Sequence, residues 1–244
     1  MTQVTSSPML DVRIWRGGDT GELVAYEVPS GENQTVLDVV TWVQRHLEPA
    51  LAYRFACRVG VCGSCAMTVN GRARWTCRSH VKDVSGAGRL VIEPLRNLPR
   101  IKDLVCDLAP FFDKWRQAGG RFAGAQTRRD PMPAVDPATD ARRTVDAGIE
   151  CINCAVCHSA CDVVGWRPDY LGPAALNRAW TLVNDERHVK TGEILDRMAV
   201  GGGCTVCHTH GSCTEHCPVG ISPTAAIAGL KRRSFRRWFP GGRT

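Results

Sequence analysis

Thirteen cysteines in a chain of 244 residues are the side chains best suited to do chemistry here. All but Cys106 gather in two regions, one from Cys57 to Cys77 and one from Cys151 to Cys217. Closely spaced cysteines serve disulfides, zinc sites, haem attachment or iron–sulfur clusters. The start, MTQVTSSPML, has neither a secretory signal nor an Arg-rich transit pattern. We therefore expect a reducing cytosol, where thiols persist as thiolate ligands.

The first region has the pattern C-x4-C-x2-C-x11-C, and its cysteines are Cys57, Cys62, Cys65 and Cys77. The first three match the spacing of plant-type [2Fe–2S] ferredoxins, in which three thiolates converge from one loop. Gly60 and Gly63 would let the backbone wrap round the cluster and aim N–H groups at sulfur. A zinc site is the alternative, but zinc loops usually take two C-x2-C pairs and this region has one.

The second region contains two related runs, CINCAVCHSAC and CTVCHTHGSCTEHCP. The first run has the C-x2-C-x2-C-x3-C spacing of bacterial cluster proteins, whose fourth cysteine ligates the other cluster. The second keeps that rhythm with His210 in place of one cysteine. Exchange of the last cysteines would give a four-thiolate set, Cys151, Cys154, Cys157 and Cys217, and a three-thiolate set, Cys161, Cys207 and Cys213.

A dihaem cytochrome c is a remote alternative, because CAVCH and CTVCH both have the C-x-x-C-H sequence of c-type haem attachment. That haem is attached outside the cytosol, and the start of the chain suggests no export. The haem interpretation also leaves four cysteines without a role: Cys151, Cys161, Cys213 and Cys217.

The elements that position the first region read as mixed α/β. Alternating apolar residues predict strands at 9–17 and 22–29, and a later strand at 89–95. Residues 35–47 have a helical period, with Thr35 and Asp38 as a capping box. Asn70-Gly71 predicts a hairpin turn between 65 and 77. These elements suit a small sheet curled over one helix.

The second region lacks strand alternation, and helical patterns at 172–187 and 222–233 predict an all-α domain. Residues 118–140 are rich in Gly, Pro, Ala and charge, which is typical of a linker or long surface loop. We therefore predict a first domain at 1–110, a linker at 111–145 and a helical domain at 146–244.

The net charge of +7 comes largely from the end of the chain, KRRSFRRWFPGG. This stretch suits either a solvated tail or contact with anionic lipid headgroups or an acidic partner. We expect no nucleic-acid binding, because no such motif accompanies the charge. No apolar run is long enough to predict a membrane span.

Taken together, these motifs resemble the iron–sulfur subunit of succinate dehydrogenase and fumarate reductase, respiratory complex II. The resemblance covers nearly the whole chain and rests on CRVGVCGSC, IEPLRNLPRIKDLVCD, ECINCAVCHSAC, YLGPAALNRAW and CHTHGSCTEHCPVGISPTAAI. It implies an α+β fold class, with an N-terminal β-grasp [2Fe–2S] ferredoxin-like domain followed by an all-α ferredoxin-like domain.

The resemblance also implies ligands for three clusters. Cys57, Cys62, Cys65 and Cys77 would hold [2Fe–2S]. Cys151, Cys154, Cys157 and Cys217 would hold [4Fe–4S], and Cys161, Cys207 and Cys213 would hold [3Fe–4S]. By position, Trp166 and His208 would line the quinone pocket. Alternatively, Trp166 is a core or interface aromatic and His208 donates to a cluster sulfur.

Several residues depart from the family pattern. Asp162 stands where Pro is usual and Val163 where Ser is frequent, which puts the quinone type in doubt. His210 replaces an apolar residue at the vacant corner of the third set, and Cys204 is an additional cysteine. Either His210 or Cys204 could bind a fourth iron there. We interpret Cys106 as a small buried residue at an apolar helix position.

The predicted function is electron transfer, with no substrate catalysis on this chain. The resemblance implies a flavoprotein partner, where succinate and fumarate interconvert on FAD, and a membrane anchor, with or without haem b, where quinone binds. It places the chain at the cytoplasmic face of the bacterial inner membrane. The alternative is the same role beside a related flavoprotein that uses another substrate.

Overall fold

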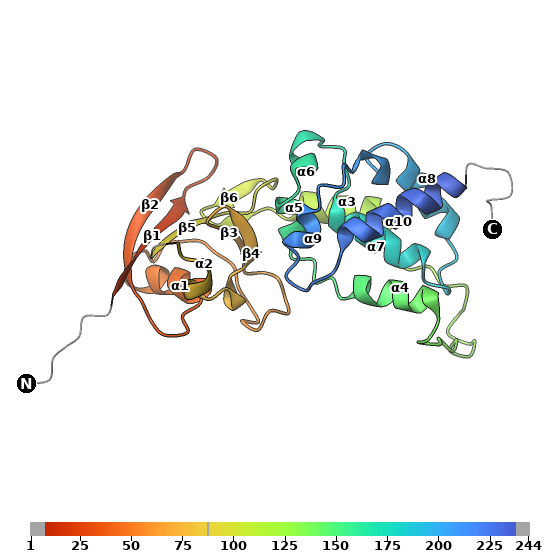
Figure 1. The fold of residues 1–244 in the computed structure, drawn as a ribbon, viewed down its shortest axis with the longest axis horizontal. Coiled ribbons are helices and arrows are strands. Elements are labelled where there is room, and N and C mark those ends of the chain that lie inside the picture. The colour runs from red at the N-terminus through yellow and green to blue at the C-terminus, as the bar shows by residue number, and fades with distance from the viewer. Residues whose placement is uncertain (1–7, 87, 238–244) are drawn as a thin grey trace, which may run out of the picture. The chain divides into compact units, whose positions relative to one another are not determined.

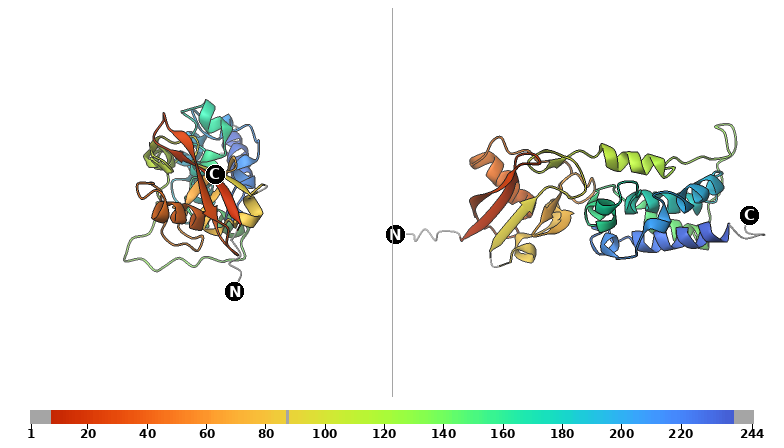
Figure 2. Two further views of the ribbon diagram at one scale, coloured as in Figure 1. Left: turned by 90° about the vertical axis from the view of Figure 1, so that its left-hand side faces the viewer. Right: turned by 90° about the horizontal axis from the view of Figure 1, so that it is seen from above.

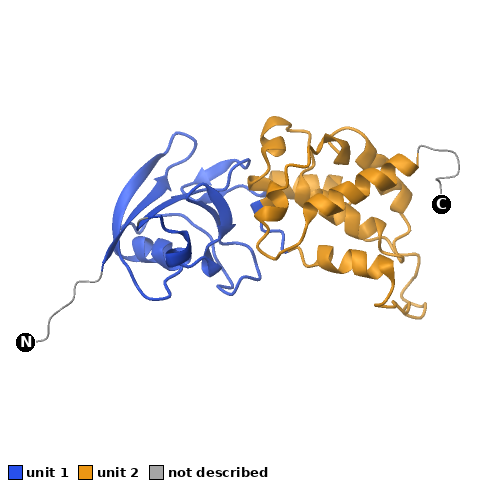
Figure 3. Cartoon of the chain, in the orientation of Figure 1, with its two compact units in different colours: residues 1–108, 152–156 blue, residues 109–151, 157–244 orange. Residues whose placement is uncertain are grey.

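The computed structural model describes residues 8–86 and 88–237, and the chain forms two compact units (Figure 3). The first unit comprises the chain up to Leu108 together with Ile152–Val156, and the second comprises Ala109–Cys151 and the chain from Cys157 onward. The division therefore lies near the expected end of the first domain. The segment expected as a linker, 111–145, groups with the second unit instead of standing apart.

The first unit is built on a five-stranded sheet with the order β2-β1-β5-β3-β4 (Figure 1). Strands β1 and β5 are parallel, and the other neighbouring pairs are antiparallel. The elements are β1 (Met9–Arg16), β2 (Glu22–Pro29), α1 (Val36–His46), β3 (Ala66–Val69), β4 (Arg72–Trp75), η1 (Thr76–Arg78), α2 (Val81–Val84), β5 (Arg89–Glu93), β6 (Arg100–Lys102) and β7 (Val105–Cys106). The sheet wraps over α1, which confirms the predicted β-grasp arrangement.

Helix α1 forms where the sequence predicts it, because its first turn is capped and one face is apolar. The Thr35 hydroxyl accepts the Asp38 N–H, and the Asp38 carboxylate accepts the Thr35 N–H, which completes a capping box. The apolar face packs against buried residues of the sheet. Figure 2 shows the ribbon of α1 beside the sheet. The face consists of Val36, Val39, Val40 and Val43.

The hairpin of β3 and β4 turns at Asn70 and Gly71, which have φ angles of 48° and 76°. Positive φ at both central residues is the geometry that an Asn-Gly hairpin turn requires. The short pair β6–β7 and helix α2 were not predicted. Cys106 is buried, as expected, but it lies in strand β7 and not in a helix, and its Sγ donates to the Leu95 carbonyl at 3.5 Å.

The second unit is helical, and no strand is assigned in it over the part of the chain that the structure describes. Its elements are α3 (Ala109–Gln117), α4 (Asp140–Ile149), α5 (Val156–Ser159), α6 (Asp162–Trp166), α7 (Pro173–Val183), α8 (Thr191–Ala199), η2 (Cys204–Val206), α9 (Ser212–Glu215) and α10 (Pro223–Arg236). Helix α7 contacts α3, α4, α8 and α10. The buried residues at the centre of the unit include Leu176, Leu182, Met198, Ile227 and Leu230.

The expected linker is structured at both ends because it buries apolar side chains and satisfies polar groups of α7. Phe111 in α3 and Val145 in α4 are each 2% exposed. Arg178 donates to the Gly120 carbonyl at 3.1 Å, and Asn177 donates to the Gly148 carbonyl, just past the segment, at 2.9 Å. Only the middle of the segment, between α3 and α4, lacks helices and strands.

The basic end of the chain is partly helical. Residues 231–236 complete α10, and residues 238–242 of the same stretch lie outside the described residues. Lys231 donates to the Cys207 carbonyl at 2.6 Å, and Arg233 donates to the Val183 carbonyl at 2.7 Å. These two cations therefore form hydrogen bonds within the second unit and are not part of a solvated tail. No helix among the described residues is long and apolar enough to cross a membrane.

Asp103 should stabilise the first unit through its ionised carboxylate. The side chain is buried and accepts from the Gly17 N–H at 2.8 Å, the Ala52 N–H at 2.8 Å and Arg16 Nε at 3.1 Å. Burial alone would raise its pKa, but these hydrogen bonds outweigh burial and lower the pKa. The stabilisation is therefore present above the carboxylate's unfolded pKa and is lost as the pH falls through the lower folded value.

We expect Asp103→Asn to lower the free energy of unfolding of the first unit by about 2 kcal/mol at neutral pH. Urea unfolding, followed by the electron paramagnetic resonance signal of the reduced [2Fe–2S] centre, measures this effect. The exposed Asp19→Asn removes the same charge and serves as the control. Equal unfolding midpoints for the two variants would contradict the assigned role of Asp103.

Candidate metal centres

The first cysteine set is assembled by the hairpin of the first unit. Cys57, Cys62 and Cys65 lie in the loop before β3, and Cys77 lies in η1 directly after β4. The Cys65 carbonyl accepts from the Thr76 N–H at 3.2 Å and from the Thr76 hydroxyl at 2.8 Å. Pairing of the two strands therefore brings the fourth cysteine to the loop that carries the other three. Cys65 and Cys77 are buried together against Leu37.

Backbone N–H groups of this loop point at the Cys57 sulfur. They come from Val59, Val61 and Cys62, at 3.4, 3.3 and 3.3 Å. These donors lower the pKa of the Cys57 thiol to about 6, because they stabilise the thiolate. Burial, with Cys65 close by, raises the pKa of Cys77 to about 11. The backbone donors therefore favour the thiolate form of Cys57, whereas burial favours the protonated thiol of Cys77.

The glycines of the loop permit close contacts. Gly60 has a φ of +78°, and a Cβ there would lie 3.0 Å from the Trp75 ring. Its N–H also donates to the Cys77 sulfur. Gly63 has a φ of +70°, and a Cβ there would lie 2.6 Å from Cβ of Cys154. Gly63 therefore leaves room for a cysteine of the next set as well as turning the loop.

The four cysteines expected in the second set are distributed over both units. Cys154 belongs to the first unit, whereas Cys151, Cys157 and Cys217 belong to the second. Asn153 and Ala155 have φ angles of 53° and 61°, so the backbone on both sides of Cys154 is left-handed. Such backbone turns a short cysteine run round a common centre. The grouping of these four thiols as one ligand set stays a prediction.

The third set lines one cavity of the second unit. Cys161, Cys207 and Cys213 all face it. Burial raises the pKa of Cys161 and of Cys213. The thiols of Cys213 and Cys207 add to the increase for Cys161, and the thiol of Cys207 adds to it for Cys213. The three thiols therefore lie within electrostatic range of one another. Among the described residues, no three His, Cys, Asp or Glu side chains lie close enough to hold a single metal ion.

Hydrogen-bond donors surround the third set, and sequence reasoning missed most of them. Tyr170 is 1% exposed, and its hydroxyl donates to the Cys207 sulfur. The Thr209 N–H donates to the same sulfur at 3.4 Å, and the Thr224 hydroxyl lies 3.3 Å from the Cys213 sulfur. No spacing rule points to Tyr170, because it reaches Cys207 only through the tertiary fold.

The three ring-bearing residues singled out from the sequence lie beside this cavity. His208 and His210 line it, with ring centroids 6.0 Å apart. Trp166, at the end of α6, packs edge-on against His210 at 6.3 Å and is 66% exposed. The exposure of Trp166 argues against a place in the core.

Cys204 lies elsewhere in the same unit. It starts η2, is fully buried in the helical core and lies within hydrogen-bond reach of Ser234 on α10. Burial raises its pKa. Cys204 does not line the cavity of the third set, whereas His210 does. Of the two candidates for a fourth iron ligand, only His210 therefore faces the cavity.

Comparisons with known proteins agree with this arrangement of cysteines. A family model for a 2Fe-2S iron-sulfur cluster binding domain matches residues 11–113, and one for a 4Fe-4S dicluster domain matches residues 148–221. The fumarate reductase iron-sulfur subunit of Mycobacterium tuberculosis is 36% identical, over 85% of this chain and 83% of that relative. The succinate dehydrogenase iron-sulfur subunit of Paracoccus denitrificans is also 36% identical, over 83% of this chain and 77% of that relative.

The chain belongs to the iron–sulfur subunits of succinate dehydrogenase and fumarate reductase. A chain of the Mycobacterium smegmatis Sdh1 complex in the apo form superposes with a TM-score of 0.83 and 28% identity, over 96% of this chain and 99% of that one. Both C-x-x-C-H sequences fall inside the dicluster match, so they belong to the cluster-binding domain of this subunit family and not to a cytochrome. The β-grasp and helical ferredoxin-like domains, [2Fe–2S] and [4Fe–4S] binding, and an electron-transfer role follow from membership.

Tyr170 should raise the reduction potential of the third centre. A hydrogen bond to a ligand sulfur stabilises the reduced form, which carries more negative charge. We expect Tyr170→Phe to lower that potential by about 20–60 mV, the one-electron equivalent of one net hydrogen bond. Redox titration of the purified complex, followed by electron paramagnetic resonance, measures the shift. The potential of the [2Fe–2S] centre is the internal control, and an unchanged third potential would contradict the role of Tyr170.

Proposed function

We propose that this subunit carries electrons between an FAD-containing flavoprotein subunit, where succinate and fumarate interconvert, and quinone at a membrane anchor. Iron–sulfur clusters supply one-electron carriers when bound. The proposal rests on the presence of three cysteine sets in a member of this subunit family. In two of these sets, hydrogen-bond donors point at the cysteine sulfur atoms. The donors fit clusters because clusters with thiolate ligands are anionic.

The proposed ligand sets are those of the sequence pattern. Cys57, Cys62, Cys65 and Cys77 hold [2Fe–2S]; Cys151, Cys154, Cys157 and Cys217 hold [4Fe–4S]; Cys161, Cys207 and Cys213 hold [3Fe–4S]. The shared cavity and the electrostatic influence of Cys207 and Cys213 on Cys161 support the third set. Its three thiols agree with a three-iron cluster, although the matching family model describes two 4Fe-4S clusters.

We further propose that quinone binds beside the third set, against Trp166 and His208. Trp166 presents an exposed apolar ring, and His208 offers a hydrogen-bonding nitrogen at the rim of the cavity. Asp162, which also lines the cavity, adds a carboxylate where the family usually has proline. The subunit would lie on the cytoplasmic face of the bacterial inner membrane, attached to its anchor.

Purification of the intact complex and assay of succinate:quinone reduction test the proposal directly. We expect an FAD-containing subunit to co-purify and succinate to reduce quinone. A co-purifying flavoprotein that ignores succinate and fumarate would show instead that the subunit serves a related enzyme with another substrate.

Trp166→Ala should slow electron transfer to quinone by about tenfold, because the substitution removes the aromatic surface next to the third set. Succinate oxidation with an artificial dye that accepts electrons upstream should be unchanged. Trp166→Phe keeps an aromatic ring against His210 and should retain most of the quinone activity. Equal loss of both activities in Trp166→Ala would show that the residue serves folding or cluster insertion.

The third cluster should remain [3Fe–4S] with His210 present but off the metal. A three-iron cluster in its oxidised all-ferric form has an odd number of electrons, so the air-oxidised complex should be paramagnetic, with about nine irons per subunit. Absence of the signal together with one more iron would mean that a fourth iron is bound. In that case His210→Ala should restore the signal. Cys204→Ala is the comparison, since Cys204 does not face the cavity.

A further inference from the structure

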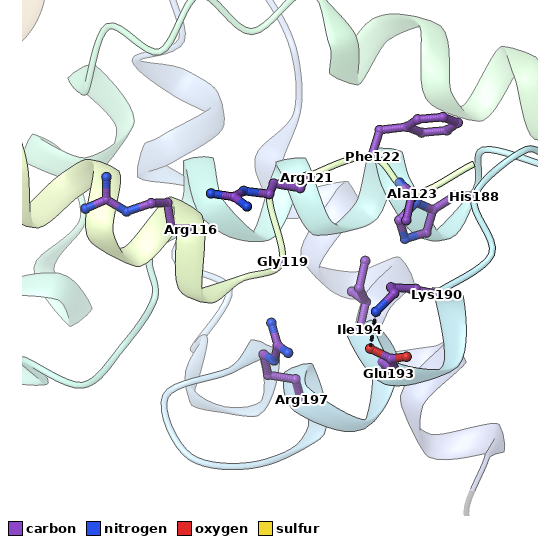
Figure 4. A pocket seen from close by; sticks show the side chains of 10 residues that line it. All are labelled: Arg116, Gly119, Arg121, Phe122, Ala123, His188, Lys190, Glu193, Ile194 and Arg197. Carbon is purple, nitrogen blue, oxygen red and sulfur yellow. Dashed lines mark hydrogen bonds and ion pairs between the residues drawn. The ribbon is translucent and has the colours of Figure 1, made fainter. Parts of the chain in front are cut away.

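A second cavity of the helical unit lies away from the cysteines. It has a volume of about 520 Å³ and lies between the end of α3, the segment after it, the loop before α8 and α8 itself (Figure 4). It shares no lining residue with the cavity of the third cysteine set. Its size is that of an ordinary small-molecule site.

The lining is strongly basic. Arg116, Arg121, Lys190 and Arg197 contribute four cations, and Glu193 is the one acidic residue among the lining residues described. Some of these groups already have partners: Arg116 pairs with Asp113, Lys190 pairs with Glu193 at 3.4 Å, and Arg197 donates to the Gln117 carbonyl at 3.1 Å. Arg121 is exposed, and no ion pair involves it in the described part of the chain. The cavity therefore carries a net positive charge that its own residues do not balance.

His188 adds an unpaired donor. The side chain is only 6% exposed, and its Nδ1 accepts the Ala123 N–H at 3.0 Å. Burial lowers the pKa of the ring, so it is neutral, and the proton must sit on Nε2 because Nδ1 is an acceptor. Nε2 has no hydrogen-bond partner within the described residues. Buried donors are normally satisfied, but Nε2 has less than 1 Å² of accessible surface, so an external acceptor reaches it only when side chains of the cavity wall move aside.

Helix α8 adds a third feature. It begins at Thr191 without a side-chain cap, and Lys190, Glu193 and Ile194 of its first turn line the cavity. Uncapped N–H groups and the positive end of a helix dipole favour a negative charge. Figure 4 shows the His188 ring beside Ala123, above Lys190 and Ile194.

We propose that this cavity binds a small multivalent anion, whose oxygens take the Nε2–H of His188 and the cations of Arg121, Lys190 and Arg197. The ligand class is defined by clustered anionic oxygens, as in a polyphosphate or a polycarboxylate. The site is separate from the electron-transfer path, so it would serve regulation or stability and its test does not depend on the quinone chemistry.

The experiment is calorimetric titration of the intact complex at constant ionic strength, with inorganic pyrophosphate in one arm and tricarballylate in the other. Saturable binding of either probe at one site per subunit is the expected result. The probe that binds more tightly shows whether the ligand is a polyphosphate or a polycarboxylate. Arg121→Ala should weaken binding about tenfold, as for loss of one charged hydrogen bond. Arg128→Ala removes an equal charge from an exposed residue outside the cavity and should leave the affinity unchanged.

His188→Asn provides the second variant. The Asn side-chain oxygen can take the place of Nδ1 as acceptor for Ala123, while the donor at Nε2 is lost, and binding should again weaken about tenfold. Cluster content and dye reduction report whether this variant folds. The proposal is overturned if neither probe binds saturably, or if Arg121→Ala binds as tightly as the Arg128→Ala control, which would place the anion on a partner subunit.

Discussion

Thiolates held close together repel one another and lose the solvation that water gives them. Each unit must offset this free-energy cost before a cluster binds. The cost is visible in the raised pKa values of Cys77, Cys161 and Cys213. The backbone N–H groups at Cys57 and the hydroxyl groups near Cys207 and Cys213 offset part of this cost. Where the structure supplies donors, as at Cys57, the thiolate is stabilised without metal.

The two units meet the constraint by different means. In the first unit the donors are backbone N–H groups of one short loop, and left-handed residues such as Arg58 and Gly60 turn these groups inward. In the second unit the donors include side chains from separate elements: Tyr170 precedes α7, and Thr224 lies in α10. A loop can form its own donor shell locally, whereas the helical unit must complete its packing before Tyr170 reaches Cys207.

That difference explains what could be predicted from the sequence. The capping box of α1, the Asn-Gly turn and the β-grasp order are local patterns, and all of them were found as predicted. The packing of α3 and α4 on α7 was missed because their Gly- and Pro-rich connection dominates the composition of that segment. Tyr170 and His188 were missed because a single polar residue has no spacing rule. Their partners are distant in the sequence.

The two C-x-x-C-H sequences show that the same motif can occupy two different structural environments. In the first, Cys154 lies between two left-handed residues in a half-exposed turn, and His158 is 2% exposed and packs edge-on against Phe111. In the second, Cys204 is in the core and His208 is exposed at the cavity rim. Corresponding positions therefore differ in burial: the first cysteine is accessible in one run and enclosed in the other, and the histidines show the reverse.

Helix α10 accounts for this difference, because Ser234 and Leu230 cover Cys204 while Lys231 donates to the Cys207 carbonyl. With the backbone fixed there, the chain after Cys207 must turn away from the core, and Thr209 does so with a φ of 63°. His208 and His210 are thereby directed to the cavity of the third cysteine set. The same C-x-x-C-H spacing therefore yields a structural cysteine in one place and a predicted ligand in the other.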